Sequence, residues 1–217
     1  MQFENDEIVV EVWGDFGCFS RPEAKVERLT YPVITPSAAR GILSAIYSKP
    51  VEFYWQVTKI EVLEPIRYMS FKRNEVKNKI AKNMNPVLVE DCRTQRQSVV
   101  LKNVRYRIYA KIVKQPEFKG SLQQLYAQAQ RRIDGGKCFY QPCMGLREFV
   151  CYFDNPSEIQ PINENADFGI MLYDVFNLHK YKVTAKAEPY ITLFHAEMKN
   201  GVIEVPDFDS ELVLKPE

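Results

Sequence analysis

The segment VVLKNVRYRIYAKIV, residues 99–113, alternates apolar and polar side chains over most of its length. This two-residue period predicts a long β-strand, because successive side chains of a strand point to opposite faces. One face is apolar and consists of Val104, Tyr106, Ile108, Ala110 and Ile112. The other face carries Arg105, Arg107, Tyr109 and Lys111. The strand therefore places three cations and a tyrosine on one side of a sheet.

Two segments on either side of this strand have the sequence features of helices. In TPSAARGILSAIY, Thr35 is a candidate N-cap and Pro36 occupies the first helical position. In SLQQLYAQAQRRID, Ser121 is a candidate N-cap, and Gly135 with Gly136 supplies the stop. We therefore expect one helix before the long strand and one after it.

Further strands are expected at 7–13 and 57–66, and near 145–153 after the second helix. The order strand, helix, strand, strand, helix, strand predicts an α+β fold of ferredoxin-like (RRM-like) type with a glycine-rich loop. We expect this domain to span residues 1–150. A basic insertion at about 72–97 is expected to form an extended loop or a protruding hairpin.

The remainder of the chain, residues 151–217, is expected to form a smaller β-rich domain. Strands are predicted at 167–176 and 190–195, followed by a KNG turn and a short VIEV strand. Near the N-terminus, GDFG at 14–17 is typical of a turn.

The composition is that of an ordinary globular protein, with 46% hydrophobic and 26% charged residues. No apolar run approaches the length of a membrane span, and the acidic N-terminus lacks the features of a signal peptide. A cytoplasmic protein is therefore expected. Five cysteines without a CxxC pair favour reduced thiols, so neither a metal site nor a cofactor is expected.

The net charge of +1 conceals a strong segregation of charge along the chain. Residues 67–147 carry 18 basic and 5 acidic side chains, or +13, between flanking segments of −4 and −8. Such a basic middle is typical of a protein that binds a polyanion. The alternative is that folding intermixes these charges on a solvated surface.

Few catalytic chemistries fit the residues. His179 and His195 are the two histidines, and the chain lacks P-loop, HExxH and GxGxxG motifs and the order of a Ser-His-Asp triad. The pattern that remains is a set of cations interleaved with aromatic residues. Cations neutralise phosphates and aromatic rings stack on unpaired bases, so this pattern favours RNA binding.

The stretch GGKCFYQPCMGLREF, residues 135–149, concentrates glycine beside basic residues. Its glycines are Gly135, Gly136 and Gly145. The cations within and before it are Arg131, Arg132, Lys137 and Arg147. Glycine allows backbone N–H groups to approach an anion closely, and arginine pairs with phosphate. The stretch is therefore either a phosphate-binding loop or a flexible connection between a helix and a strand.

Several segments together resemble one known family. VWGDFGCFSRPEAKVERLTYPVITPSAARGILSAIYSKP, FKRNEV at 71–76, QPCMGLREF at 141–149 and MKNGVI at 198–203 occur in the order seen in the CRISPR-associated Cas-five family of type I-C systems, the d subtype. The similarity covers nearly the whole chain. It implies a ferredoxin-like fold with a glycine-rich loop, of the repeat-associated RNA-binding superfamily.

The resemblance also implies an activity. Members of this subtype cut the repeats of the CRISPR precursor RNA without metal, by attack of a ribose 2′-OH that leaves a 2′,3′-cyclic phosphate. They then keep the 5′ tag and join the interference complex with a large subunit and backbone subunits. The expected function is thus that of a CRISPR RNA-processing endoribonuclease acting in antiviral defence. The alternatives are a non-catalytic subunit that caps the 5′ tag and a protein that binds duplex DNA non-specifically.

The family's site consists of a tyrosine at the end of the first helix and a Lys-His pair before the second helix. The tyrosine corresponds to Tyr47, and the nearest lysine is Lys119, which no histidine follows. Counting back without gaps from Gly145 instead places Gln124 and Leu125 at the positions of the pair. We expect these two residues to be catalytic. The expected RNA-binding residues are Arg21, Lys25, Arg28, Arg40, Arg73, Arg131, Arg132, Lys137 and Arg147. Lys72, Lys77 and Lys79 accompany Arg73 in the basic insertion, which is expected to contact RNA or a neighbouring subunit.

Overall fold

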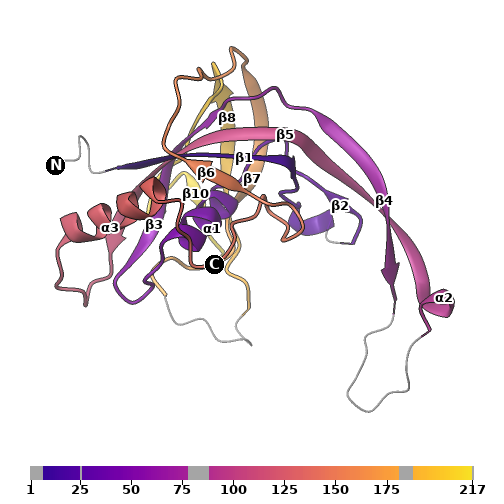
Figure 1. The fold of residues 1–217 in the computed structure, drawn as a ribbon, viewed down its shortest axis with the longest axis horizontal. Helices are drawn as coiled ribbons and strands as arrows, with labels where there is room; N and C mark the ends of the chain where they lie inside the picture. The colour runs from indigo at the N-terminus through magenta and orange to yellow at the C-terminus, as the bar shows by residue number, and fades with distance from the viewer. Residues whose placement is uncertain (1–6, 25, 78–87, 181–187, 217) are drawn as a thin grey trace.

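A computed structural model describes residues 7–24, 26–77, 88–180 and 188–216. In these parts of the chain, ten strands form one sheet whose main path runs β10-β8-β9-β3-β5-β1-β6 (Figure 1). None of the helices described is long and apolar enough to cross a membrane.

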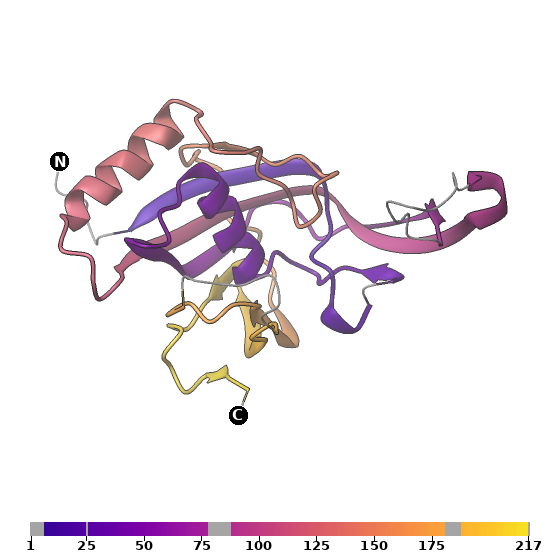
Figure 2. The ribbon, with the colours of Figure 1, turned by 90° about the horizontal axis from the view of Figure 1, so that it is seen from below.

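The centre of the sheet has the ferredoxin-like arrangement. The elements follow the order β1 (Ile8–Gly17), α1 (Pro36–Ile46), β3 (Phe53–Val62), β5 (Arg93–Lys114), α3 (Leu122–Asp134) and β6 (Tyr152–Asp154). Their strands pair antiparallel in the order β3-β5-β1-β6. Helices α1 and α3 lie on one face of this sheet (Figure 2). The α+β, ferredoxin-like prediction is confirmed.

The first helix begins where its sequence predicts. The Thr35 hydroxyl accepts a hydrogen bond from the backbone N–H of Ala38 at 3.2 Å, and Pro36 occupies the first position. The apolar side of α1, which includes Ile42 and Leu43, is buried. Helix α3 starts at Leu122 without a side-chain cap recorded at its N-terminus and is followed by the expected glycine stop.

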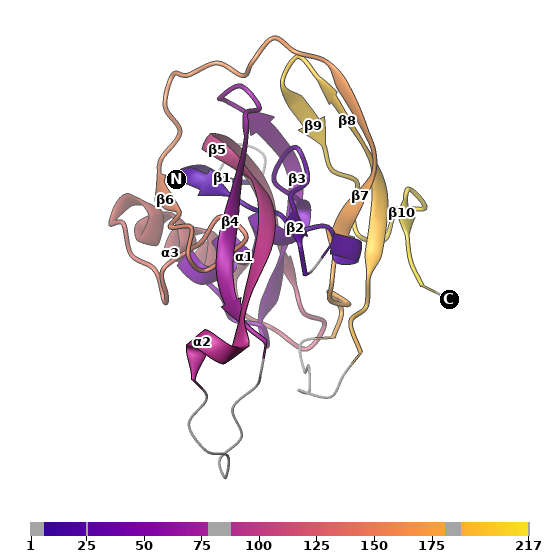
Figure 3. The same cartoon turned by 90° about the vertical axis from the view of Figure 1, so that its right-hand side faces the viewer.

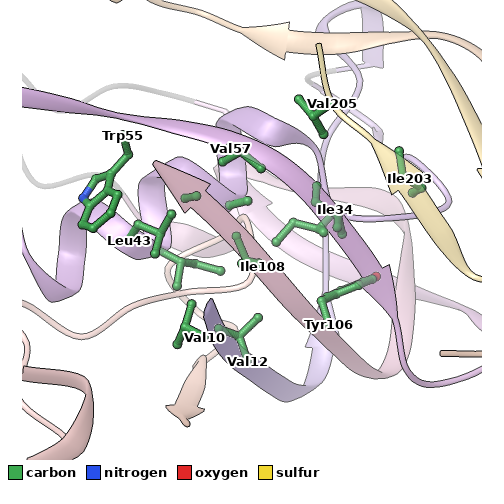
Figure 4. Close-up of a cluster of buried hydrophobic side chains, with 14 of the residues drawn as sticks. Val10, Val12, Ile34, Leu43, Trp55, Val57, Tyr106, Ile108, Ile203 and Val205 are labelled. Carbon is green, nitrogen blue, oxygen red and sulfur yellow. The ribbon is translucent and has the colours of Figure 1, made fainter. Parts of the chain in front are cut away.

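The core lies between the helices and the sheet. Val10 and Val12 of β1, Ile108 of β5 and Leu43 of α1 are at most 1% exposed and pack in one cluster (Figure 4). These are the apolar positions that the strand and helix periods predict. Burial of each such side chain contributes about 1.5–3 kcal/mol, so this cluster is what holds α1 in place.

Strand β4 (Tyr68–Val76) pairs with the first half of β5 and forms a curved ribbon that projects from the body (Figures 1 and 3). We call this ribbon the arm. A short helix, α2 (Val89–Cys92), lies at its end, and β2 (Arg28–Leu29) pairs with β5 at its base. The predicted protruding hairpin is therefore present, while Lys79 lies outside the described residues.

The C-terminal strands β7 (Ala166–Asp174), β8 (Thr192–Lys199), β9 (Val202–Glu204) and β10 (Val213–Leu214) extend the sheet beyond β3 (Figure 3). The connection is made by β9, which is hydrogen-bonded to β3. The division of the chain into units of residues 1–150 and 151–217 stays a prediction.

Two local predictions were wrong. The GDFG segment, expected as a turn, is the end of β1, because it continues to pair with β5 as far as Gly17. The strand expected near 145–153 is limited to β6, because the preceding residues form a loop packed against the end of β1.

Candidate active site

A cleft of about 760 Å³ opens where the C-terminal end of α1 meets α3. The end of α1, the turn before α3, the exposed side of α3 and the loop after α3 all contribute side chains to it. Its lining includes Tyr47, Phe118, Gly120, Ser121, Gln124, Arg131, Arg132 and Phe139. The structure thus brings together residues that lie up to 92 positions apart in the sequence.

Tyr47 follows the last residue of α1, and its side chain forms part of the wall of this cleft. The residue is only 3% exposed, and its ring lies between those of Phe53 and Phe139, at centroid distances of 5.4 and 6.3 Å. Its backbone carbonyl accepts a hydrogen bond from Trp55 Nε1 at 2.7 Å. Burial raises the pKa of Tyr47 above its usual value, so the phenol is neutral near pH 7.

A cation is held next to this tyrosine. The Arg132 guanidinium lies 4.0 Å from the ring centroid of Phe139 and 5.8 Å from that of Tyr47. Its Nη1 donates to the backbone carbonyl of Ile46 at 3.3 Å, while its buried Nε has no hydrogen-bond partner in the described parts of the chain. Arg131, one residue earlier, is exposed and lines the same cleft. The two arginines can neutralise a phosphate placed beside Tyr47.

Lys119 directly precedes Gly120, which lines the cleft, but Lys119 itself is not among the lining residues. The lysine is exposed, and the cleft is lined at this point by Gly120 and Ser121, which follow it. Its assignment as catalytic stays a prediction.

Both histidines are engaged elsewhere. His179 Nε2 lies 2.8 Å from Asp209 Oδ1, and its ring packs on Phe208. His195 Nε2 lies 2.9 Å from Asp167 Oδ1, on an exposed part of β8. Neither ring lines the cleft described above.

The glycine-rich stretch forms an anchored loop that runs from the end of α3 toward the base of the arm (Figure 2). The N–H of Phe139 donates to the carbonyl of Ala45 at 2.7 Å, and the N–H of Cys18 donates to the carbonyl of Met144 at 2.9 Å. Gly145 has φ +83°, and a Cβ there would lie 2.1 Å from the Cys18 carbonyl oxygen. This glycine is therefore required by its positive φ and by contact with Cys18, the residue that follows β1.

The other two glycines lie at the start of this loop, where α3 ends. Gly135 is the C-cap of the helix, and Gly136 has φ +58°. Gly136 leaves open space around its missing Cβ, so it is needed for its backbone conformation alone. Lys137 follows and is exposed.

A second group of cations meets at the base of the arm, around Glu148 of this loop. Arg28 of β2 and Arg73 of β4 lie with their Nη1 atoms 3.1 and 3.5 Å from the same oxygen, Glu148 Oε1. Arg147 precedes this glutamate and is exposed. The structure therefore brings together Arg28 and Arg73, which lie in separate segments of the sequence, beside the loop that carries Arg147.

The remaining predicted RNA-binding residues are not part of either group. Arg21 stacks on Tyr31 with a distance of 4.8 Å to the ring centroid. Arg40 forms a bidentate ion pair with Asp174, at 2.5 and 2.9 Å, in a different cleft. Lys25 lies outside the described residues.

Two of the three cations on the polar face of β5, Arg105 and Arg107, are neutralised by an ion network that was not expected from the sequence. Arg105 Nε donates to Glu11 Oε1 at 2.6 Å, and Arg107 Nη1 donates to Glu61 Oε2 at 2.8 Å. Glu11 and Glu61 are both opposite Arg107 in the strand register. The available signal was a glutamate among the apolar residues of each neighbouring strand, Glu11 in β1 and Glu61 in β3.

The comparisons with known proteins agree on one family. Residues 7–206 match the profile of the CRISPR-associated Cas5 proteins of the Cas5d group. The chain is 41% identical over 228 residues to the CRISPR pre-crRNA endoribonuclease Cas5d of Mannheimia succiniciproducens, covering 95% of this chain and 97% of that protein. It is also 41% identical over 213 residues to the protein of the same name from Thermus thermophilus, covering 92% and 91%.

One solved structure has the same fold. It is a CRISPR-associated protein that superposes with a TM-score of 0.68 at 22% identity, covering 95% of both chains. The family profile, the two relatives and this likeness of fold all concern the same segment of the chain. The protein is a member of the Cas5d family of CRISPR-associated proteins.

Proposed function

We propose that this protein is a metal-independent endoribonuclease that cleaves CRISPR precursor RNA within its repeats. The supporting observation is the position of Tyr47 in a cleft lined by two arginines, in a chain that is 41% identical to relatives named pre-crRNA endoribonucleases. The basic residues of the loop and the arm fit a polyanionic substrate.

The reaction is attack of a ribose 2′-OH on the adjacent phosphate. The 2′ oxygen forms a bond to phosphorus, the bond to the 5′ oxygen breaks, and the products are a 2′,3′-cyclic phosphate and a 5′-hydroxyl. The 2′-OH loses a proton and the leaving 5′ oxygen gains one. No external oxidant or reductant takes part.

The cleft supplies positioning and charge. Tyr47 is a neutral phenol, so its role is to hold the 2′-OH by a hydrogen bond rather than to act as an anionic base. Arg131 and Arg132 stabilise the charge that develops on the phosphorane oxygens. Lys119, next to Gly120 in the chain, is the candidate for a further cation that reaches the bound phosphate. Orientation and charge stabilisation together account for cleavage at a modest rate.

After cleavage the protein keeps the 5′ tag and assembles with the large and backbone subunits of the type I-C interference complex. The arm and the loop offer the extended basic surface that such retention requires. The same cations give weak, salt-sensitive binding to duplex DNA. A cytoplasmic location follows from this role.

A second candidate function is that of a non-catalytic subunit that caps the 5′ tag. The observation that favours it is Gly120, which follows Lys119 where the family pattern has a histidine. Under this proposal the cleft binds RNA but lacks a proton donor.

The test is incubation of the purified protein in EDTA with repeat RNA from its own locus and with a 2′-deoxy version substituted at the cut. A single cut that persists in EDTA and disappears with the 2′-deoxy sugar is expected. Tight binding without a cut would instead support the capping function. Duplex DNA bound as tightly as the repeat hairpin, at two salt concentrations, would contradict both.

A further inference from the structure

Two arginines, Arg28 and Arg73, share one carboxylate, Glu148, although a simple ion pair needs only one cation. Arg28 and Arg73 come from two different strands, and both contact one oxygen of a carboxylate on the loop. Their side chains are 26% and 18% exposed, whereas that of Glu148 is 49% exposed. The cations are thus better enclosed than the anion that pairs with them.

The carboxylate satisfies the two guanidiniums only in part. Each arginine contributes one Nη1 atom to Glu148 Oε1, and the contact of Arg73 is long, at 3.5 Å. Arg73 Nη2 is buried and makes no hydrogen bond within the described parts of the chain, although Glu75 Oε1 is 3.0 Å away. A guanidinium pairs best with two oxygens at once, and a phosphate offers oxygens to both forks.

The side chain of Arg73 and the backbone of Arg28 are held in place independently of Glu148. Arg73 Nε donates to the hydroxyl of Ser98 at 2.9 Å, and Arg28 is opposite the same serine in the pairing of β2 with β5. Glu148 lies on a loop and is more exposed than Arg28 or Arg73. Its carboxylate can therefore move into solvent while Arg73 keeps its bond to Ser98 and the backbone of Arg28 keeps its place in β2.

We propose that Arg28 and Arg73 form a binding subsite for a backbone phosphate of single-stranded RNA, which Glu148 occupies in the free protein and leaves when RNA binds. The identity of the ligand rests on the proposed function. The subsite is separate from the cleft at Tyr47, whose lining includes none of Arg28, Arg73 and Glu148. The loop of residues 135–149 runs from the end of α3 toward the base of the arm (Figure 2). Glu148 lowers the affinity for RNA, because its charge competes with that of the phosphate.

The test is the affinity of Glu148→Gln for repeat RNA that carries the 2′-deoxy substitution, measured by fluorescence anisotropy over a series of salt concentrations. The variant is expected to bind about three- to tenfold more tightly than the wild type, the range set by the loss of one or two exposed ion pairs. The slope of log K against log salt is expected to steepen by up to about 0.7, the value for one further phosphate on a single strand.

The matched control is Glu197→Gln on β8. That carboxylate is also half-exposed and paired with one cation, Lys199 at 3.0 Å, so its removal changes the net charge equally. It is expected to leave the affinity unchanged within about twofold, as for an isolated surface charge. If both variants unfold at the same Tm as the wild type, the difference in their RNA affinities reflects binding and not a loss of folded protein.

A double-mutant cycle adds a readout that a purely structural role would not give. Arg28→Gln is expected to weaken binding several-fold more in the Glu148→Gln background than in the wild type, because the glutamate already masks this arginine. Additive effects, or Glu148→Gln binding no more tightly than Glu197→Gln, would overturn the subsite. In that case the proposed function would stand as long as the wild type binds and cleaves repeat RNA. A wild type that binds no repeat RNA would overturn the proposed function as well.

Discussion

Replacing Glu11 with glutamine is expected to lower the free energy of unfolding by about 2–4 kcal/mol. The Glu11 side chain is 1% exposed, and its Oε2 accepts a hydrogen bond from the backbone N–H of Ser157 at 2.9 Å. It accepts hydrogen bonds from Arg105 Nε at 2.6 Å, from Arg107 Nη2 at 3.3 Å and from the Ser157 hydroxyl at 2.8 Å. The amide keeps the shape of the carboxylate but removes its charge and one acceptor.

The size of this loss of stability follows from the interactions that Arg105 and Arg107 keep in the variant. Breaking a buried ion pair costs about 3–5 kcal/mol when the remaining charge is left alone. Here Arg107 retains Glu61 at 2.8 Å and the carbonyls of Ser157 and Ile159, also at 2.8 Å. Arg105 is 28% exposed and reaches water. These remaining partners reduce the cost to the range given.

The effect depends on pH. Burial alone would raise the pKa of Glu11, but hydrogen bonds from Ser157 and Arg105 outweigh it and hold the pKa below its usual value. A lowered pKa in the folded state contributes stability above the unfolded-state pKa, and this contribution is lost as the pH falls through the folded pKa. The difference between wild type and variant is therefore largest near pH 7 and shrinks below about pH 4, near the ordinary pKa of glutamate.

Urea unfolding followed by tryptophan fluorescence at pH 7 and at pH 3.5 measures both quantities. Glu197→Gln serves as the control, since an exposed pair contributes at most about 1 kcal/mol. A loss under 1 kcal/mol for Glu11→Gln at pH 7, or a loss of equal size at both pH values, would refute this account of the network.

Three further predictions concern the cleft and the loop. Tyr47→Phe is expected to slow single-turnover cleavage by about 10²-fold or more with RNA affinity unchanged, and an unaltered rate would show that its hydroxyl only packs. Replacing Arg131 and Arg132 with alanine is expected to weaken RNA binding and flatten its salt dependence, measured by anisotropy; an unchanged slope would remove them from the interface. Gly145→Ala is expected to lower Tm, because its φ of +83° is strained for alanine. Gly41→Ala in α1 is expected to raise Tm, because the added methyl meets open space and alanine stabilises the helix by up to about 1 kcal/mol. Equal melting of these two variants would contradict the strain argument.

The elements that the sequence predicted well are those governed by local rules. Thr35 and Pro36 set the start of α1 through a cap and a fixed φ, and the alternation in β5 sets its two faces. Such features depend on residues within a few positions of one another. The order of these elements then sufficed for the ferredoxin-like fold, because that arrangement follows from how two strand–helix–strand units share one sheet.

The site was predictable only in part, because it depends on which distant segments meet. Tyr47 and Arg132 come from separate helices, and their proximity follows from the packing of α1 beside α3. The GDFG segment was misread for a related reason. Its glycine pattern is typical of a turn, but Gly14 is needed in the strand itself, where a Cβ would lie 2.6 Å from the carbonyl oxygen of Val150.

The charge segregation along the chain shows what composition can and cannot say about an RNA interface. Arg105 and Arg107 contribute to the basic middle, but they lie in the centre of a strand between two neighbours that each supply a glutamate. Cross-strand pairing neutralises cations in such positions. Arg131 and Arg132 instead lie in the last turn of α3, where the helix dipole favours cations, and neither forms an ion pair with an acid of the described residues. The position of a cation within its element, more than the net charge of its segment, therefore decides whether it can meet a phosphate.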